Sequence, residues 1–363
     1  MTSRKLLPAL IGFLFLWSCS KTDDTAPIGN EPASLYFPGV SDTSWARMTE
    51  SDLNWDKDSL DALRNFLSDR KTKAFLVLKN GKIALEWYFG NFGRDSNWYW
   101  ASAGKTLTSM LVGIAYQDSL LDLQDRTSDY LGAGWTSLTG QQEDRIRIWH
   151  QLTMTTGLDD NVNDKDCTAD TCLRYKADPG TRWAYHNAPY TLLDKVVETA
   201  SGMTYNNYFR QKIRDRIGMN GGWIKLDQNN VYFSTARSMA RYGLLLLNRG
   251  WWDQTAVLRD STYHQSMITG SQPMNPSYGY LTWLNGKDVH MLPSTQIVFP
   301  GMLIPNAPSD CYAALGKNDQ KLYVVPSKGL VVVRMGDAAY DSRLAVTVFD
   351  NEIWGKLKGI MRY

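Results

Sequence analysis

The sequence lacks the short motifs that mark several common enzyme classes. It contains no G-x-S-x-G nucleophile elbow, H-E-x-x-H zinc motif, P-loop or G-x-G-x-x-G turn in 363 residues. Histidine is scarce, so a Ser-His-Asp triad, with His186 as its base, has little support. The four histidines are His150, His186, His264 and His290. These absences argue against metal and nucleotide chemistry, and we expect neither a metal nor another cofactor.

An excess of charge of one sign is also lacking. There are 39 Lys and Arg residues against 37 Asp and Glu residues, which leaves a net charge of +2. No basic run carries interleaved aromatic residues, so we expect no nucleic-acid partner. The hydrophobic fraction of 43% is ordinary, and the length suits one large domain or two closely joined ones. The 14 Trp residues indicate a large aromatic core or, alternatively, a groove for carbohydrate or peptidoglycan.

Long hydrophobic runs are scarce, and the one at residues 6–17 is too short to span a bilayer comfortably. It follows two basic residues, which is typical of a signal peptide. Residues 16–19, Leu-Trp-Ser-Cys, resemble a bacterial lipoprotein cleavage box, although its tryptophan is unusual and plain secretion is the alternative. We predict a signal peptide over 1–19, lipidation of Cys19 and a flexible tether over 20–34. The protein would then be a lipoprotein of the bacterial cell envelope, held to the outer membrane by its N-terminal lipid.

Cysteine is rare, with four residues in the chain. Cys167 and Cys172 lie five positions apart in a polar stretch, and an oxidising compartment would favour a disulfide between them. Zinc is a poor alternative, because no histidine accompanies the pair at ligand spacing. We expect Cys311 to be a buried thiol.

Hydrophobic periodicity predicts strands near both ends of the chain and helices between them. Asn80-Gly81 separates two β-rich runs and indicates a hairpin, because both turn residues need positive φ. A sheet built from both chain ends, with a mainly helical subdomain at about 117–225 inserted in a domain over 35–363, follows from this order. The predicted helices cover residues 56–70, 102–116 and 234–249, and the predicted strands 74–78, 83–89, 278–283, 321–325 and 329–335.

The spacing S-x-x-K occurs at Ser18, Ser68 and Ser102, so the spacing alone is a weak signal. Only Ser102 opens an apolar helix, on which Lys105 would lie on the same face one turn later. Burial would lower the pKa of Lys105, so its neutral amine could take the Ser102 proton. The helix N-terminus would favour a developing oxyanion. The alternative is that Ser102 is a helix cap.

A second candidate is the triplet Tyr185-His186-Asn187. A phenol near the serine and lysine can pass a proton to a leaving group, and Asn187 can hold a substrate amide or orient Lys105. The same spacing occurs at Tyr205, which begins a helix and is expected to be packed. Tyr185 instead follows a Pro-Gly turn and precedes an apolar helix, which favours a position at a loop rim.

In this order the motifs resemble those of the serine β-lactamase-related hydrolases. These include class C β-lactamases, family VIII esterases, D-amino-acid peptidases and 6-aminohexanoate-dimer hydrolases. The resemblance implies an α+β fold of the β-lactamase/penicillin-binding kind, in which the active site lies between an antiparallel sheet flanked by helices and the inserted helical subdomain. It runs from about residue 74 to residue 335, in the stretches WASAGKTLTSMLVGIA (100–115), IRIWHQLTMTTGLDD (146–160), GTRWAYHNAPYTLLDKVVETASGMTYNNYF (180–209) and STARSMARYGLLLLNRGWW (234–252).

The resemblance also implies a mechanism. Ser102 would attack an ester or amide carbonyl and form an acyl-enzyme, which water would then hydrolyse. Lys105 and Tyr185 would act together as general base and general acid and would titrate as a coupled pair. Asn187 matches the Asn of the second motif. The expected substrate is a small ester, amide or D-peptide.

The third motif of the family departs from its pattern here. The usual Lys-Thr-Gly, His-x-Gly or Gly-rich variant is replaced by residues 315–320, Leu-Gly-Lys-Asn-Asp-Gln. We expect Lys317 to substitute for the substrate-carboxylate anchor and Asn318 for the backbone donor, unless the stretch is a plain polar turn. This departure argues against an efficient β-lactamase, and it leaves a catalytically silent binding or sensor lipoprotein as the alternative. At the cleft rim we expect three tryptophans, namely Trp98, Trp100 and Trp183.

Overall fold

A computed structural model describes residues 1, 35–341 and 347–362 of the chain. Its helices and strands all belong to the unit Ser34–Tyr363. The predicted cleavage box, lipidated Cys19 and tether over 20–34 lie outside the described residues.

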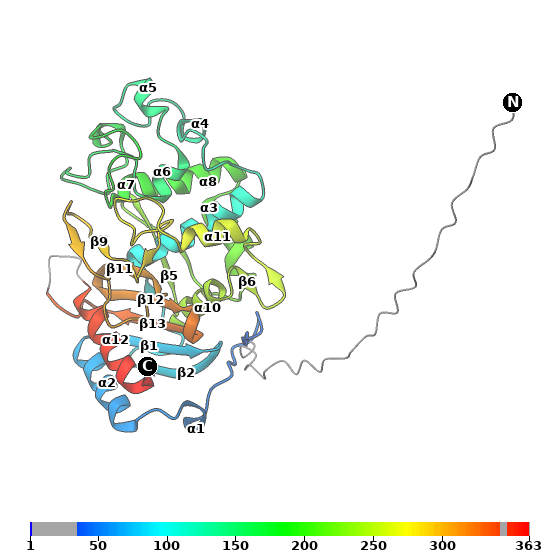
Figure 1. The fold of residues 1–363 in the computed structure, drawn as a ribbon, viewed down its shortest axis with the longest axis vertical. Coiled ribbons are helices and arrows are strands. Elements are labelled where there is room, and N and C mark those ends of the chain that lie inside the picture. Colours follow the sequence, from blue (N-terminus) through cyan, green and yellow to red (C-terminus); the bar gives the residue numbers. More distant parts are fainter. Residues whose placement is uncertain (2–34, 342–346, 363) are drawn as a thin grey trace. The chain divides into compact units, whose positions relative to one another are not determined.

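The main sheet has six antiparallel strands in the order β2-β1-β13-β12-β11-β8 (Figure 1). Strand β1 pairs with β13, although about 250 residues separate them, so the sheet joins both ends of the domain as the sequence predicted. The strands are β1 (Thr72–Lys79), β2 (Lys82–Tyr88), β8 (Trp283–Leu284), β11 (Tyr312–Gly316), β12 (Gln320–Val325) and β13 (Leu330–Gly336).

The predicted hairpin at Asn80-Gly81 is confirmed. The two residues have φ values of 48° and 81°, the left-handed region that a tight two-residue turn requires. A Cβ atom on Gly81 would lie 1.9 Å from the carbonyl oxygen of Tyr36, so the N-terminal segment also needs glycine here.

Helices cover both faces of the main sheet, as alternate residues of β12 show. Leu322 lies against α10 (Ala236–Leu247), where a Cβ on Gly243 would meet its side chain at 2.7 Å. Lys321 and Tyr323 point the opposite way and bond to Asp350 of α12 (Val348–Met361), at 2.9 and 2.7 Å. Since successive side chains alternate between faces, α10 and α12 lie on opposite sides of the sheet. α2 (Lys57–Asp69) packs beside α12, and its N-cap Asp56 bonds the amide of Ser59.

The segment between the β1–β2 hairpin and α10 contains α3 (Lys105–Gln117), which is buried from Lys105 to Ala115. Long irregular stretches separate the short helices that follow, so this part is less regular than the predicted helical block. These helices are α4 (Ser128–Leu131), α5 (Gly140–Glu143), α6 (Ile148–Leu152), α7 (Asn187–Thr191), α8 (Leu193–Ser201) and α9 (Tyr205–Phe209). A small sheet of β3 (Trp98–Tyr99), β5 (Asn229–Ser234) and β4 (Gly222–Leu226) packs against the turn before α3.

Two features near the C-terminal half differ from the sequence prediction. The strand expected over 278–283 is mostly a turn, in which Leu281 has φ 50°. An isolated antiparallel bridge joins Tyr278 to Trp283, where strand β8 begins. Its aromatic residues pack as a cluster rather than along a strand, which shows that β propensity reports packing as much as backbone preference. Strand β11, with the sequence Tyr-Ala-Ala-Leu-Gly, was missed.

The structure joins Cys167 and Cys172 by a disulfide, whereas Cys311 is a buried free thiol. Among the described residues, no helix combines the length and the apolar character that crossing a bilayer requires.

Candidate active site

Ser102 lies in a 3₁₀ turn, η1 (Ala101–Gly104), that leads directly into α3. The chain reaches this turn from β3 through Ala101, whose φ is 47°. Gly104 faces the Trp223 ring, where an added Cβ would lie 3.3 Å away, so the turn is packed closely against the small sheet. Ser102 is therefore presented at the start of a buried helix on a well-supported turn.

Lys105 is the first residue of α3 and is 4% exposed. Its Nζ donates a hydrogen bond to Ser102 Oγ at 3.2 Å. The same nitrogen lies 4.0 Å from the ring centre of Tyr190 and 5.2 Å from that of Tyr185. Aromatic faces attract a cation but do not accept its proton. The two tyrosine rings therefore leave the amine free to exchange a proton with Ser102.

Burial lowers the pKa of Lys105 from its ordinary value of 10.5 to about 7. The negative charges of Asp166 and then Asp194 oppose this shift in part. A substantial fraction of Lys105 is therefore neutral near pH 7 and able to accept the serine proton, as a general base must be.

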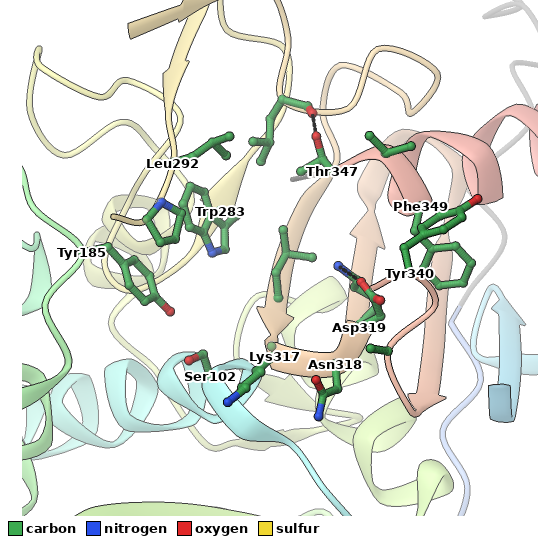
Figure 2. A pocket seen from close by; sticks show the side chains of 17 residues that line it. Ser102, Tyr185, Trp283, Leu292, Lys317, Asn318, Asp319, Tyr340, Thr347 and Phe349 are labelled. Carbon is green, nitrogen blue, oxygen red and sulfur yellow. Dashed lines mark hydrogen bonds and ion pairs between the residues drawn. The ribbon is translucent and has the colours of Figure 1, made fainter. Parts of the chain in front are cut away.

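Tyr185 is held by an aromatic cluster. Its ring stacks on Trp283 at 5.8 Å with an interplanar angle of 19°, and Tyr278 and Trp183 flank it at 6.2 and 6.5 Å. Figure 2 shows its hydroxyl pointing toward Ser102 across the cavity. Burial raises the pKa of Tyr185 well above its usual value, and a hydrogen bond with Ser102 offsets only part of this effect. The phenol thus holds its proton at neutral pH and is suited to donate it.

Asn187 begins α7, two residues after Tyr185. Its Nδ2 donates to Asp166 Oδ1 at 2.7 Å, and its Oδ1 is buried without a hydrogen-bond partner among the described residues. Asn187 does not line the cavity beside Ser102. The structure brings Ser102, Lys105 and Tyr185 together directly, whereas the Asn187 side chain bonds Asp166 outside the cavity lining.

A cavity of about 380 Å³ opens on Ser102 and Tyr185. This volume is in the usual range for small-ligand sites. Its apolar wall comes from the end of the main sheet, from the loops around β9 (Val289–Met291) and from α12 (Figure 2). The main apolar side chains are Trp283, Leu292, Pro293, Leu303, Leu315 and Phe349.

Several polar side chains on the cavity wall are already bonded to other protein groups. Thr347 donates to the carbonyl oxygen of Leu303 at 2.7 Å, as Figure 2 shows. Asp319 accepts a bond from the amide of Ala339 at 2.9 Å and pairs with Lys321 at 3.2 Å. These bonds use the Thr347 hydroxyl proton and engage both Asp319 oxygens in support of the wall.

Lys317 and Asn318 both line the cavity. Lys317 is exposed, as an anchor for a substrate anion would be. Asn318 has φ 58°, and its side-chain amide donates to the Tyr99 hydroxyl at 2.7 Å, so this side chain holds the loop.

Sequence reasoning missed Gly316, the last residue of β11. A Cβ on this residue would lie 2.4 Å from the carbonyl oxygen of Trp100 and 3.0 Å from the amide nitrogen of Ala103. Only glycine lets the strand approach the turn that carries Ser102 this closely. The available signal was the glycine at the strand end, since glycine in a strand often marks close backbone approach.

The expected cleft rim of tryptophans is wrong, whereas the position of His186 agrees with the little support that a histidine base had from the sequence. Trp100 and Trp183 are 0% and 1% exposed and belong to the core, so they do not form a cleft rim; Trp98 is half-buried, and its indole bonds the carbonyl of Gly336 at 3.2 Å. His186 is buried, burial lowers its pKa to about 4, and it does not line the cavity. Within the described part of the chain, no three His, Cys, Asp or Glu side chains gather as a metal site.

This fold and the meeting of serine, lysine and tyrosine define a class of protein. The sequence profile of the family described as Beta-lactamase matches residues 62–348, most of the chain, and the chain belongs to this family.

Individual relatives share low sequence identity with this chain. The chain is 26% identical over 263 residues to the 6-aminohexanoate-dimer hydrolase of Paenarthrobacter ureafaciens. The aligned region covers 61% of this chain and 65% of that protein. Thus the chain matches just under two thirds of the length of this curated relative.

Two solved structures show the same fold. A Bacillus anthracis protein provisionally named 6-aminohexanoate-dimer hydrolase superimposes with a TM-score of 0.64 at 19% identity, covering 90% of this chain and 88% of its own. A beta-lactamase/D-alanine carboxypeptidase from Yersinia pestis, solved with citrate, gives 0.61 at 17% identity and covers 86% of this chain and 99% of its own.

Proposed function

We propose that the protein is a serine hydrolase that cleaves a small ester, amide or D-peptide through an acyl-enzyme on Ser102. The observation that carries this proposal is the buried Lys105 amine bonded to Ser102 Oγ at 3.2 Å. Such a pair converts a weak hydroxyl nucleophile into a strong one without histidine.

The proposed reaction has two halves. Lys105 accepts the Ser102 proton as Oγ bonds to the carbonyl carbon, and Tyr185 gives a proton to the leaving oxygen or nitrogen as its bond to that carbon breaks. Lys105 returns the proton to Tyr185 through the hydrogen-bonded site. In the second half a water molecule loses a proton to the same pair and its oxygen bonds to the acyl carbon. The bond from that carbon to Ser102 Oγ then breaks, and the pair returns the proton to Oγ, which releases the acid and restores Ser102.

We further propose that the backbone amides of Ser102 and Lys317 stabilise the oxyanion. Support comes from Gly316, whose missing Cβ lets β11 approach the 3₁₀ turn at Trp100 and Ala103. The start of α3 adds partial positive charge on the same side. The proposed backbone donor is therefore Lys317, directly after Gly316, whereas the sequence analysis expected Asn318 to supply the donor.

The substrate portion beside Ser102 is proposed to be apolar, with an acceptor or anion near Lys317. The apolar wall of the cavity and the prior engagement of its polar side chains support this choice. The names of the relatives motivate amide and D-peptide substrates.

A side-by-side assay tests the function. The purified protein is incubated with p-nitrophenyl esters, nitrocefin, linear aminohexanoate dimer and D-Ala-D-Ala dipeptides, with the Ser102→Ala variant as control. We expect turnover of at least one ester or amide that the variant lacks. Equal rates for both proteins would overturn the proposal, and an absence of turnover with every compound would favour the silent binding protein.

We also propose export and lipid anchoring at Cys19, so that the enzyme would act in the cell envelope. The support is the sequence of residues 1–24, with its basic start, apolar run, cysteine and following polar residues.

A further inference from the structure

The disulfide-closed loop is fastened to the start of α7. Asp166, immediately before Cys167, accepts the 2.7 Å hydrogen bond from Asn187 Nδ2. The neighbouring carbonyl of Lys165 accepts a bond from the amide of Ala188 at 3.1 Å. Cys167 is then tied to Cys172. Side-chain and backbone bonds therefore hold Asp166 against the element that follows Tyr185.

The bond to Asp166 decides which way the Asn187 amide points. A carboxylate only accepts hydrogen bonds, so the NH₂ end must face Asp166 and the oxygen must face the opposite side. That oxygen is buried and without a partner among the described residues. It is available to accept a bond from an ammonium in the protein interior.

Asp166 also acts on Lys105 by its charge. Its negative charge is the largest influence that opposes the loss of the Lys105 proton, ahead of Asp194. Burial raises the pKa of Asp194 to about 7, so Asp194 is partly neutral at physiological pH. The other titratable groups facing Lys105 are the phenols of Tyr185 and Tyr190, which burial keeps protonated.

We propose that Asp166 is a positioning residue, which orients the Asn187 amide through their 2.7 Å hydrogen bond and adds a negative charge to the surroundings of Lys105. The inference rests on the proposed function of Ser102 and Lys105. The Cys167–Cys172 disulfide restrains the segment directly after Asp166 and so helps to hold this carboxylate in place.

The test separates charge from position. The rate at which a fluorophosphonate probe labels Ser102 is measured between pH 5 and 9 for the wild type, Asp166→Asn and Asp166→Ala. Asn keeps an acceptor for Asn187 but removes the charge, whereas Ala removes both. Asp170→Asn, at an exposed acid of the same loop, is the matched control for the change in net charge.

We expect Asp166→Asn to label at a near wild-type maximal rate, with its half-maximal pH lowered by about one unit, because a nearby opposite charge shifts a pKa by that order. Asp166→Ala should show the same shift and a maximal rate lower by about tenfold, the order expected for one charge-assisted hydrogen bond. Asp170→Asn should shift neither quantity.

Unchanged half-maximal pH in Asp166→Asn, or an equal shift in Asp170→Asn, overturns the inference while leaving the proposed function intact. If Asp166→Ala does not fold, the Asp166→Asn profile decides alone. Failure of the wild type to label at any pH would instead contradict the proposed function, and this inference with it.

Discussion

Lys105 reaches Ser102 from within the molecule, over one helical turn, with 4% of its surface exposed. The lysine is therefore desolvated in the resting protein, and its lowered pKa is a property of the fold. Burying an amine costs folding free energy, so the proposed role of Lys105 as a base and the stability of the fold are opposed at this residue.

The cost of burying the Lys105 amine predicts that Lys105→Met is more stable than the wild type at pH 6. We expect a difference of about 1–4 kcal/mol, the range found when buried ion pairs are replaced by apolar groups. The folded-state pKa is about 7, below the ordinary 10.5, so the unfolded state binds more protons between these values. Wild-type stability should rise with pH over that window, and the advantage of the variant should shrink.

Urea unfolding at pH 6 and pH 9 measures this difference. Lys71→Met is the control, because Lys71 belongs to another S-x-x-K pair and is exposed. Its stability should stay within about 0.5 kcal/mol of the wild type. Equal stability of Lys105→Met and wild type at pH 6 would mean that the buried amine carries no such cost.

Tyr185→Phe should separate substrates by leaving group. The ring can still stack on Trp283, but the proton for the leaving atom is lost. We expect acylation by anilides to fall by about 10²–10⁴-fold, the usual size of general-acid catalysis, and acylation by p-nitrophenyl esters to fall much less, because p-nitrophenolate needs no proton. Pre-steady-state release of chromophore gives both rates.

Tyr278→Phe is the matched control for that experiment. Tyr278 packs against the same cluster, and its buried hydroxyl has no partner among the described residues. Its removal should leave both rates nearly unchanged. Equal losses for anilide and ester in Tyr185→Phe would show that the phenol acts by packing alone.

Gly316→Ala should damage catalysis more than folding. Gly316 has φ −126°, which alanine adopts freely, so the effect arises from the 2.4 Å contact with Trp100 and not from backbone strain. Moving β11 away from Ser102 should cost about 10²–10³-fold in acylation, as the loss of one oxyanion donor does. Gly93→Ala, where a Cβ meets nothing within 4 Å, is the control in the same kinetic assay. Wild-type acylation in Gly316→Ala would remove β11 from the oxyanion site.

Cys19→Ala should release the protein from bacterial membrane fractions, because a lipid chain is the anchor that we propose. Ultracentrifugation and immunoblotting of wild type, Cys19→Ala and Ser20→Ala test this prediction. Membrane association of Cys19→Ala at the wild-type level would contradict lipidation at this cysteine.

Local signals predicted much of the fold. The Asn80-Gly81 turn, the capped helix after Asp56 and the apolar helix after Ser102 each carry their information within a few neighbouring residues. The sequence does not predict strand β11, because the strand has only five residues and three of them, two alanines and a glycine, have low β propensity. Its pairing with β12 and β8, across the chain, is what makes it a strand.

The candidate site was predictable only in its motifs. The spacing of Ser102 and Lys105 lies in the sequence, but the aromatic environment of Lys105 depends on Tyr190, which carried no distinguishing pattern. The rim prediction is wrong because an aromatic residue near a motif can belong to the core, as Trp100 does. Gly316 was overlooked because its importance arises from a contact with a turn more than 200 residues away.

The central claim is tested most directly by covalent labelling of Ser102 with a fluorophosphonate, located by peptide mass spectrometry. The account predicts a single adduct on the peptide that contains Ser102, none in Ser102→Ala, and a labelling rate in Lys105→Ala that is lower by about 10²–10⁴-fold, while Lys71→Ala labels normally. Labelling of Lys105→Ala at the wild-type rate would contradict the account, because Ser102 would then be activated by a group other than its neighbouring amine.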